Sequence, residues 1–167
     1  YSIKKNELVP MYLEMKGRDN QRTFKNRTKI EIDDLNFFCG NKNLFHLKKK
    51  YLDNKLINQF IFDFYRKKIL PKVIIDYNRR ALLSKNGLYF RLTFDSDIKA
   101  CSSQDIFEKN HNWKECISGN DILEVKFDRS IPAWFHRIIQ SYNLNRKSIS
   151  KFAIGMTTCG VAKETSD

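Results

Sequence analysis

The sequence predicts an α+β fold: an antiparallel β barrel with a charged lumen and helices packed outside it. Strand-like segments alternate apolar and charged residues, and amphipathic helical segments lie between them. In residues 121–128, Glu124 and Lys126 share one face, while the leucine, valine and phenylalanine beside them share the other. The apolar face needs a helix layer and the charged face needs a lumen, so a closed barrel satisfies both.

Composition favours one folded domain. The chain has 167 residues, 41% of them hydrophobic, which is enough to bury a core. We expect a single domain over 1–160 and a frayed tail over 161–167. The net charge of +12 indicates a polyanionic partner, with a lysine-rich solvated surface as the plain alternative. The scattered cysteines and histidines lack zinc-site spacing, and no apolar run reaches the ~18 residues of a membrane span.

The first half reads as a hairpin followed by helices. Segments 9–18 and 23–30 alternate as two strands. Helical spacing predicts a short helix near 33–38 and a longer one near 54–68. Asp53 or Asn54 is the expected N-cap of the longer helix, and Pro71 is expected to end it.

The second half adds three strands and a helix. Residues 72–82 and 88–97 form two strands, 100–120 read as a loop, and 121–128 form the third strand. Ser130 is the expected N-cap of the following helix, with Pro132 in its first turn. The segment NRKSISKFAIG is expected to form a short basic turn that leads into a final structured element.

Basic residues stand on what looks like a common face of five strands. They are Lys16, Lys25, Arg27, Arg79, Arg91 and Lys126. Any one of them alone would usually be a solvated charge, but a lumen lined by all of them needs an anion, and successive phosphates fit. Glu14 and Glu124 would pair with a neighbouring base or hold Mg²⁺ or Mn²⁺ on the phosphates; for Glu14 we favour the salt bridge.

Several motifs together resemble a known family. In chain order they are YLEMK, FKNR, YNRRAL, GLYFRLTFD, ILEVKF with PAWF, and SISKFAIG. They are similar to the VTC domain of the vacuolar transporter chaperone polyphosphate polymerases, in the triphosphate tunnel metalloenzyme (CYTH-like) superfamily. The resemblance implies a tunnel barrel that moves the terminal phosphate of ATP onto a polyphosphate chain.

The resemblance also implies roles for single residues. Arg79, Arg91, Lys126 and Glu124 would be catalytic, with Glu124 the ligand of Mn²⁺ or Mg²⁺. The phosphate-binding residues would be Lys16, Lys25, Arg27, Arg79, Arg91, Lys126 and Lys151. Supporting roles would fall to Glu14, Tyr77, Thr93 and Asp95, the last of which would orient Arg91.

Other readings stay open beside this one. The same tunnel would suit a hydrolase of triphosphate or tripolyphosphate, or a module that only binds polyphosphate or inositol phosphate. Nucleic acid is disfavoured as a partner, because the basic residues alternate along strands and build no stacking platform. Family members have earlier strands, which we expect from a preceding segment or another chain. We expect a cytoplasmic protein, alternatively at the cytosolic face of a membrane with membrane-associated partners.

Overall fold

The computed structural model describes residues 10–19, 22–39, 43–85, 89–106, 108 and 110–162. The chain divides into two compact units. Unit 1 comprises Tyr1–Lys72 and Ser103–Lys109, and unit 2 comprises Val73–Ser102 and Asn110–Asp167. The single domain over 1–160 stays a prediction.

Unit 1 begins with the expected hairpin. Strands β1 (Met11–Asp19) and β2 (Arg22–Ile30) pair antiparallel along their whole length. Gly17 lies opposite Phe24, and the Phe24 ring occupies the space that a Cβ at Gly17 would need. A side chain at Gly17 would therefore displace that ring.

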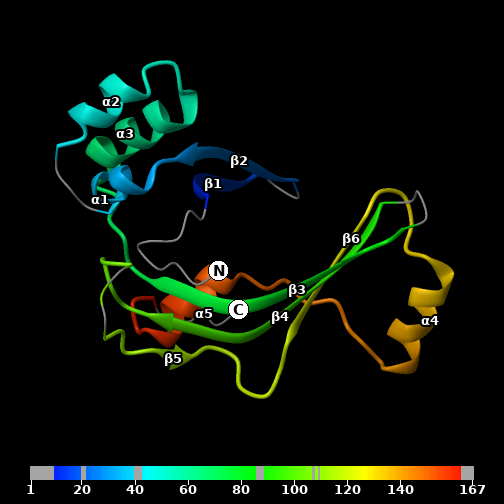
Figure 1. Cartoon of the computed structure of the whole chain (residues 1–167). Coiled ribbons are helices and arrows are strands. Elements are labelled where there is room, and N and C mark those ends of the chain that lie inside the picture. Colours follow the sequence, from blue (N-terminus) through cyan, green and yellow to red (C-terminus); the bar gives the residue numbers. More distant parts are fainter. Residues whose placement is uncertain are drawn as a thin grey trace. The chain divides into compact units, whose positions relative to one another are not determined.

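Helices complete unit 1 and form its core with the hairpin (Figure 1). A 3₁₀ turn η1 (Ile32–Asp34) leads into α1 (Leu35–Phe38), α2 (Phe45–Lys50) and α3 (Lys55–Lys67). The buried residues are Ile30, Leu35, Leu44, Leu47, Ile57, Ile61 and Phe64. Met11 and Leu13 pack against them from β1, so the apolar face of the hairpin meets helices, as its alternation predicts.

The ends of α3 refine the sequence prediction. Asn54 is its N-cap, with Oδ1 accepting from the backbone N–H of Leu56 and of Ile57 at 3.2 Å each. The helix ends at Lys67 and the chain turns at Lys68 in a left-handed conformation, so Pro71 is not what stops it. Helix α2 was not predicted.

A buried carboxylate ties η1 to the end of α2. Asp34 accepts hydrogen bonds from Lys50 Nζ and Tyr51 OH, both at 2.7 Å, and Lys50 also reaches Glu31 at 2.6 Å. Burial would raise the pKa of Asp34, but the hydrogen bonds from Lys50 and Tyr51 outweigh it and hold the pKa below its ordinary value.

Unit 2 is built on a twisted antiparallel sheet (Figure 1). Its central strand β4 (Phe90–Cys101) pairs with β3 (Ile74–Leu83), β5 (Lys114–Glu115) and β6 (Ile122–Phe127). Strand β4 thus runs four residues past its predicted end, and β5 lies within the predicted loop. The α+β antiparallel fold is confirmed, and the described strands form two sheets without closing into a ring.

A β-bulge interrupts the alternation of β4. The β3–β4 register shifts between Asp76 and Asn78, and Asp97 has a positive φ of 51°. Two residues of β4 there oppose one of β3, so the side-chain phase moves by one. As a consequence, the buried side chains of Ile98 and Ala100 lie on the same face as Asp95, although an unbroken strand would place these even-numbered residues on the face opposite the odd-numbered Asp95.

Two helices lie at opposite ends of this sheet (Figure 1). Helix α4 (Ala133–Ser141) packs Phe135 on Phe90, with ring centroids 5.2 Å apart. Its N-cap is Pro132 and not Ser130, which corrects the sequence prediction.

Helix α5 (Lys151–Thr158) is the predicted last structured piece, and Ser150 caps it through the N–H of Ala153. Its close approach to the sheet depends on Gly155. A Cβ there would lie 3.2 Å from the side chains of Ala100 and Ile75.

Candidate functional site

One face of the unit 2 sheet carries most of the predicted site residues. Across β3 and β4, Arg79 pairs with Asp95; across β4 and β6, Thr93 pairs with Glu124 and Arg91 with Lys126. Directly opposite residues of antiparallel strands project to the same side. The register therefore gathers these side chains from three strands.

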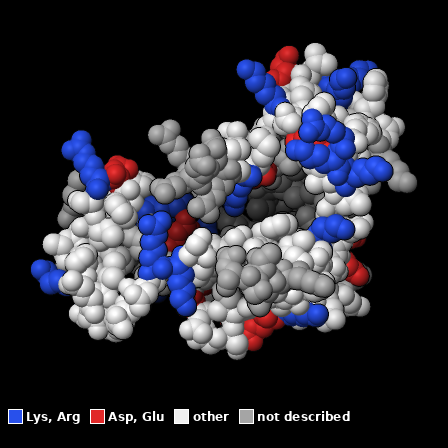
Figure 2. All heavy atoms as spheres, turned by 180° about the vertical axis from the view of Figure 1, so that it is seen from behind, with Lys and Arg blue, Asp and Glu red and all other residues white. Residues whose placement is uncertain are grey.

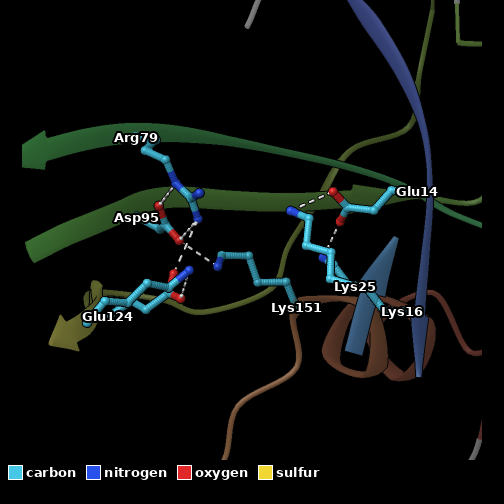
Figure 3. A network of polar contacts seen from close by, with 8 residues as sticks. Glu14, Lys16, Lys25, Arg79, Asp95, Glu124 and Lys151 are labelled. Carbon is cyan, nitrogen blue, oxygen red and sulfur yellow. Dashed lines mark hydrogen bonds and ion pairs between the residues drawn. The ribbon is translucent and has the colours of Figure 1, made fainter. Parts of the chain in front are cut away.

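Asp95 is the centre of this face, and its side chain is fully buried (Figure 3). Its two carboxylate oxygens accept from Arg79 Nε at 2.6 Å and Arg79 Nη2 at 2.7 Å, a bidentate pair. Lys151 Nζ, from the first turn of α5, lies 2.5 Å from Oδ2. The described partners of Asp95 are thus Arg79 and Lys151, and not Arg91 as the family resemblance implied.

Opposing effects set the charge state of Asp95. Burial would raise its pKa, but the hydrogen bonds from Arg79 and Lys151 outweigh burial and leave the pKa below its ordinary value. The same pairing raises the pKa of Arg79. The site therefore holds a carboxylate anion between two cations at neutral pH.

The ring of Tyr77 contacts the same two cations. Arg79 Cζ lies 5.2 Å and Lys151 Nζ 5.0 Å from its centroid. Both distances are within the range of cation–π attraction. Tyr77 and Asp95 together restrict where Arg79 and Lys151 can point.

Glu124 is more open than Asp95. Its side chain is 41% exposed, with Oε1 3.1 Å from Lys126 Nζ and Oε2 3.9 Å from Arg79 Nη2 (Figure 3). Among the described residues, no group of three or more His, Cys, Asp or Glu side chains is placed to hold a metal ion. An accessible single carboxylate fits Mg²⁺ or Mn²⁺ that arrives with phosphate, since Mg²⁺ is often held by one carboxylate plus phosphate oxygens and water.

Arg91 and Lys126 form the least balanced part of the face. They lie directly opposite each other on β4 and β6, where two like charges repel. Within the described residues, the buried Nε of Arg91 has no hydrogen-bond partner. Lys126 already has Glu124 as its ion-pair partner, so the unsatisfied group is the Arg91 Nε, which an anion here would supply with an acceptor.

Unit 1 repeats the arrangement on its hairpin. Lys16 of β1 lies opposite Lys25 of β2, and Glu14 lies opposite Arg27. Glu14 bridges the two lysines, at 3.0 Å from Lys16 Nζ and 2.6 Å from Lys25 Nζ (Figure 3). Burial alone would raise the pKa of Glu14, but the lysine hydrogen bonds lower it below the ordinary value. Arg27 stacks over the Tyr12 ring, with Cζ 4.9 Å from the centroid.

The two units thus share one arrangement of charged residues. In each, a Glu-x-Lys strand faces a neighbouring strand that places a second cation opposite the lysine. The family model of the VTC domain matches residues 1–159. The chain belongs to the VTC domain family. No curated protein matches it.

Membership in the VTC domain family links the chain to polyphosphate. Within unit 2, the fold gathers the residues for which the resemblance implied roles: Tyr77, Arg79, Arg91, Thr93, Asp95, Glu124, Lys126 and Lys151. The unit 1 set comprises Glu14, Lys16, Lys25 and Arg27. In the described part of the chain, no helix of this VTC domain is long and apolar enough to cross a membrane.

Sequence reasoning missed two links within the site. One is the contact between Asp95 and Lys151, which come from distant parts of the chain. The other is the position of the Tyr77 ring beside both cations. The sequence holds no signal for the first link, because the apolar residues of 90–100 keep the same parity before and after Asp95 and do not reveal the bulge.

Proposed function

We propose that this VTC domain transfers the terminal phosphate of ATP onto a polyphosphate chain. The phosphoryl-transfer reaction needs positioning and charge neutralisation more than a protein nucleophile. A terminal phosphate oxygen of the acceptor chain attacks the γ-phosphorus of ATP. The bond from that phosphorus to the bridging oxygen breaks, and ADP leaves with the bond electrons.

The opposed pair Arg91 and Lys126 carries the proposal. Two cations face each other across neighbouring strands, and the buried Nε of Arg91 has no partner among the described residues. A buried donor without an acceptor is costly, and a phosphate oxygen would remove that cost while also neutralising the repulsion. We infer that a phosphate group lies here when substrate is bound.

The remaining cations would extend the phosphate path in each unit. Arg79 and Lys151 are already oriented by Asp95, so they bind phosphate with little further ordering. On the hairpin, Lys16, Lys25 and Arg27 would serve in the same way, with Glu14 as their counter-ion in the empty state.

Glu124 would hold Mn²⁺ or Mg²⁺. The metal would supply neutralisation of phosphate charge. In the absence of phosphate, the contacts of Glu124 with Lys126 and Arg79 keep its carboxylate at the site.

The proposed reaction is tested by incubating the purified protein with ATP and Mn²⁺ or Mg²⁺ and separating the products by chain length. We expect long polyphosphate and ADP. Glu124→Gln and Arg91→Ala should each slow product formation by about a hundredfold, as loss of a charge-stabilising group does. Glu115→Gln makes the same change on the exposed strand β5 and should leave the rate unaltered.

The products also distinguish the related functions. Inorganic phosphate or short products without long chains would assign a hydrolase. Tight binding of ATP or polyphosphate without turnover would assign a binding module for polyphosphate or inositol phosphate. No binding of either at low salt would refute all three.

A further inference from the structure

The outward side of α3 exposes large apolar side chains. Its inward side buries Ile57, Ile61 and Phe64 in the unit 1 core. On the other side, Phe62 is 55% and Tyr65 is 57% exposed, three positions apart. Residues at i and i+3 lie on one helical face, so the two rings form a stripe at the end of the helix.

The chain just beyond the helix exposes two further apolar residues. Lys68 turns it in a left-handed conformation, and Ile69 and Leu70 follow, both exposed. We call Phe62, Tyr65, Arg66, Lys68, Ile69 and Leu70 the α3 surface. Its four apolar side chains are 41–57% exposed, and the Tyr65 hydroxyl accepts a hydrogen bond from the backbone N–H of Leu44.

Cations surround these apolar groups. Arg66 lies over the Phe62 ring, 5.6 Å from the centroid. Lys67 forms an ion pair with Asp63 at 2.8 Å, which neutralises the acidic residue of this part of α3. Figure 2 shows lysine and arginine side chains gathered over the helical part of unit 1, at the upper right.

We propose that the α3 surface binds an anionic lipid bilayer. At such an interface, exposed rings and aliphatic side chains enter the region between headgroups and acyl chains, while lysine and arginine reach anionic headgroups. A soluble polyanion would use the cations but gain little from Ile69 and Leu70. Helix α3 has 13 residues, too few to span a bilayer, so it would lie on the surface.

The inference is independent of the proposed phosphoryl transfer, because it uses none of the site residues. It is tested by co-sedimentation of the whole protein with phosphatidylcholine vesicles, with and without phosphatidylserine. We expect binding only when phosphatidylserine is present, weakening as salt rises. Arg66→Glu/Lys68→Glu should reduce binding by about tenfold or more, since each basic residue near an anionic surface contributes several-fold.

A variant that loses apolar side chains distinguishes binding to a bilayer from binding to other polyanions. Phe62→Ser/Ile69→Ser keeps every charge and should still reduce vesicle binding by about tenfold, because it removes the inserted groups. Binding of inorganic polyphosphate by this variant should be unchanged. Arg146→Glu/Lys147→Glu is the matched charge control, at exposed residues of unit 2.

Four results would overturn the proposal. The first is no vesicle binding by the unaltered protein. The second is equal loss in the control, which would mean diffuse attraction. The third is unchanged vesicle binding by the apolar variant, which would make the α3 surface a general polyanion site. The fourth is marked destabilisation of the apolar variant in urea, which would mean that the α3 surface is covered within the molecule.

Discussion

Lys151, at the start of α5, and Asp95, in β4, form an ion pair whose carboxylate is fully buried. Arg79 completes the cluster from β3. A short helix, a central strand and an outer strand of unit 2 are thus tied at one carboxylate. The contact positions Lys151 over the sheet face that carries Arg91 and Glu124.

Asp95→Asn is predicted to destabilise unit 2. The substitution leaves Arg79 and Lys151 without their anion. We expect a loss of about 2 kcal/mol, less than the roughly 3–5 kcal/mol of a fully buried pair, because both cations are partly exposed. Urea unfolding measures it.

Asp97→Asn is the control for this change. It removes the same charge from the same strand, at an exposed residue whose positive φ asparagine tolerates. The variant should stay within about 0.5 kcal/mol of the unaltered protein. Equal losses in the two variants would contradict the role given to Asp95.

Acidification is predicted to weaken unit 1 through Asp34. The folded-state pKa of this residue is depressed below the ordinary 3.8, so the unfolded state binds protons first as pH falls. The stabilisation is therefore present above that value and is lost as pH falls through the folded-state pKa. Urea unfolding over a series of pH values should show this decline, and Asp34→Asn should make it shallower.

The adjacent carboxylate provides the comparison for Asp34. Asp33→Asn removes an exposed neighbour in the same 3₁₀ turn. It should keep the full acid dependence. If Asp33→Asn flattened the curve as much as Asp34→Asn, the network with Lys50 and Tyr51 would not be its source.

Asn54→Ala is predicted to cost about 1–2 kcal/mol, the usual value for losing an N-cap side chain. Its Oδ1 caps α3, and its Nδ2 donates to Thr28 Oγ1 at 2.7 Å. Thermal or urea unfolding would record the loss. Thr28→Val removes only the second contact and should cost less; a Thr28→Val effect as large as that of Asn54→Ala would place the stabilisation in the strand contact and not in the cap.

Glu14→Gln is predicted to strengthen binding of inorganic polyphosphate by about two- to fivefold, the range of one partly exposed ion pair. Glu14 neutralises Lys16 and Lys25 in the empty hairpin, so its loss frees both for phosphate. Titration at low salt measures the change, with exposed Asp53→Asn as the charge-matched control. Weaker binding by Glu14→Gln would instead assign Glu14 a direct role, such as holding the metal.

Much of the fold follows from local patterns. The alternation of 11–16 and 122–127 predicts strands and assigns their charged faces, and the register confirms both. Asn54 was one of two predicted caps because asparagine preceded a helical repeat. These features depend on neighbours in sequence, which a pattern records directly.

The remainder depends on contacts distant in sequence. Helix α2 buries only Leu47, so it shows little periodicity. At the start of α4, Ser130 has the better capping chemistry, yet the helix begins after Pro132. The sequence prediction paired Asp95 with Arg91, which lies on the same face of its own strand. In the structure, Asp95 instead pairs with Arg79, directly opposite on β3, and with Lys151 of α5.

The central claim is that one face of the unit 2 sheet binds phosphate. Arg79 and Arg80 test it directly, because adjacent strand residues point to opposite faces and Arg80 lies opposite Phe94. The measurement is the affinity of Arg79→Ala and Arg80→Ala for inorganic polyphosphate under identical salt. We predict a loss of at least about tenfold for Arg79→Ala, since hydrogen bonds between charged groups are strong, and little change for Arg80→Ala. Equal losses in both variants would contradict the claim.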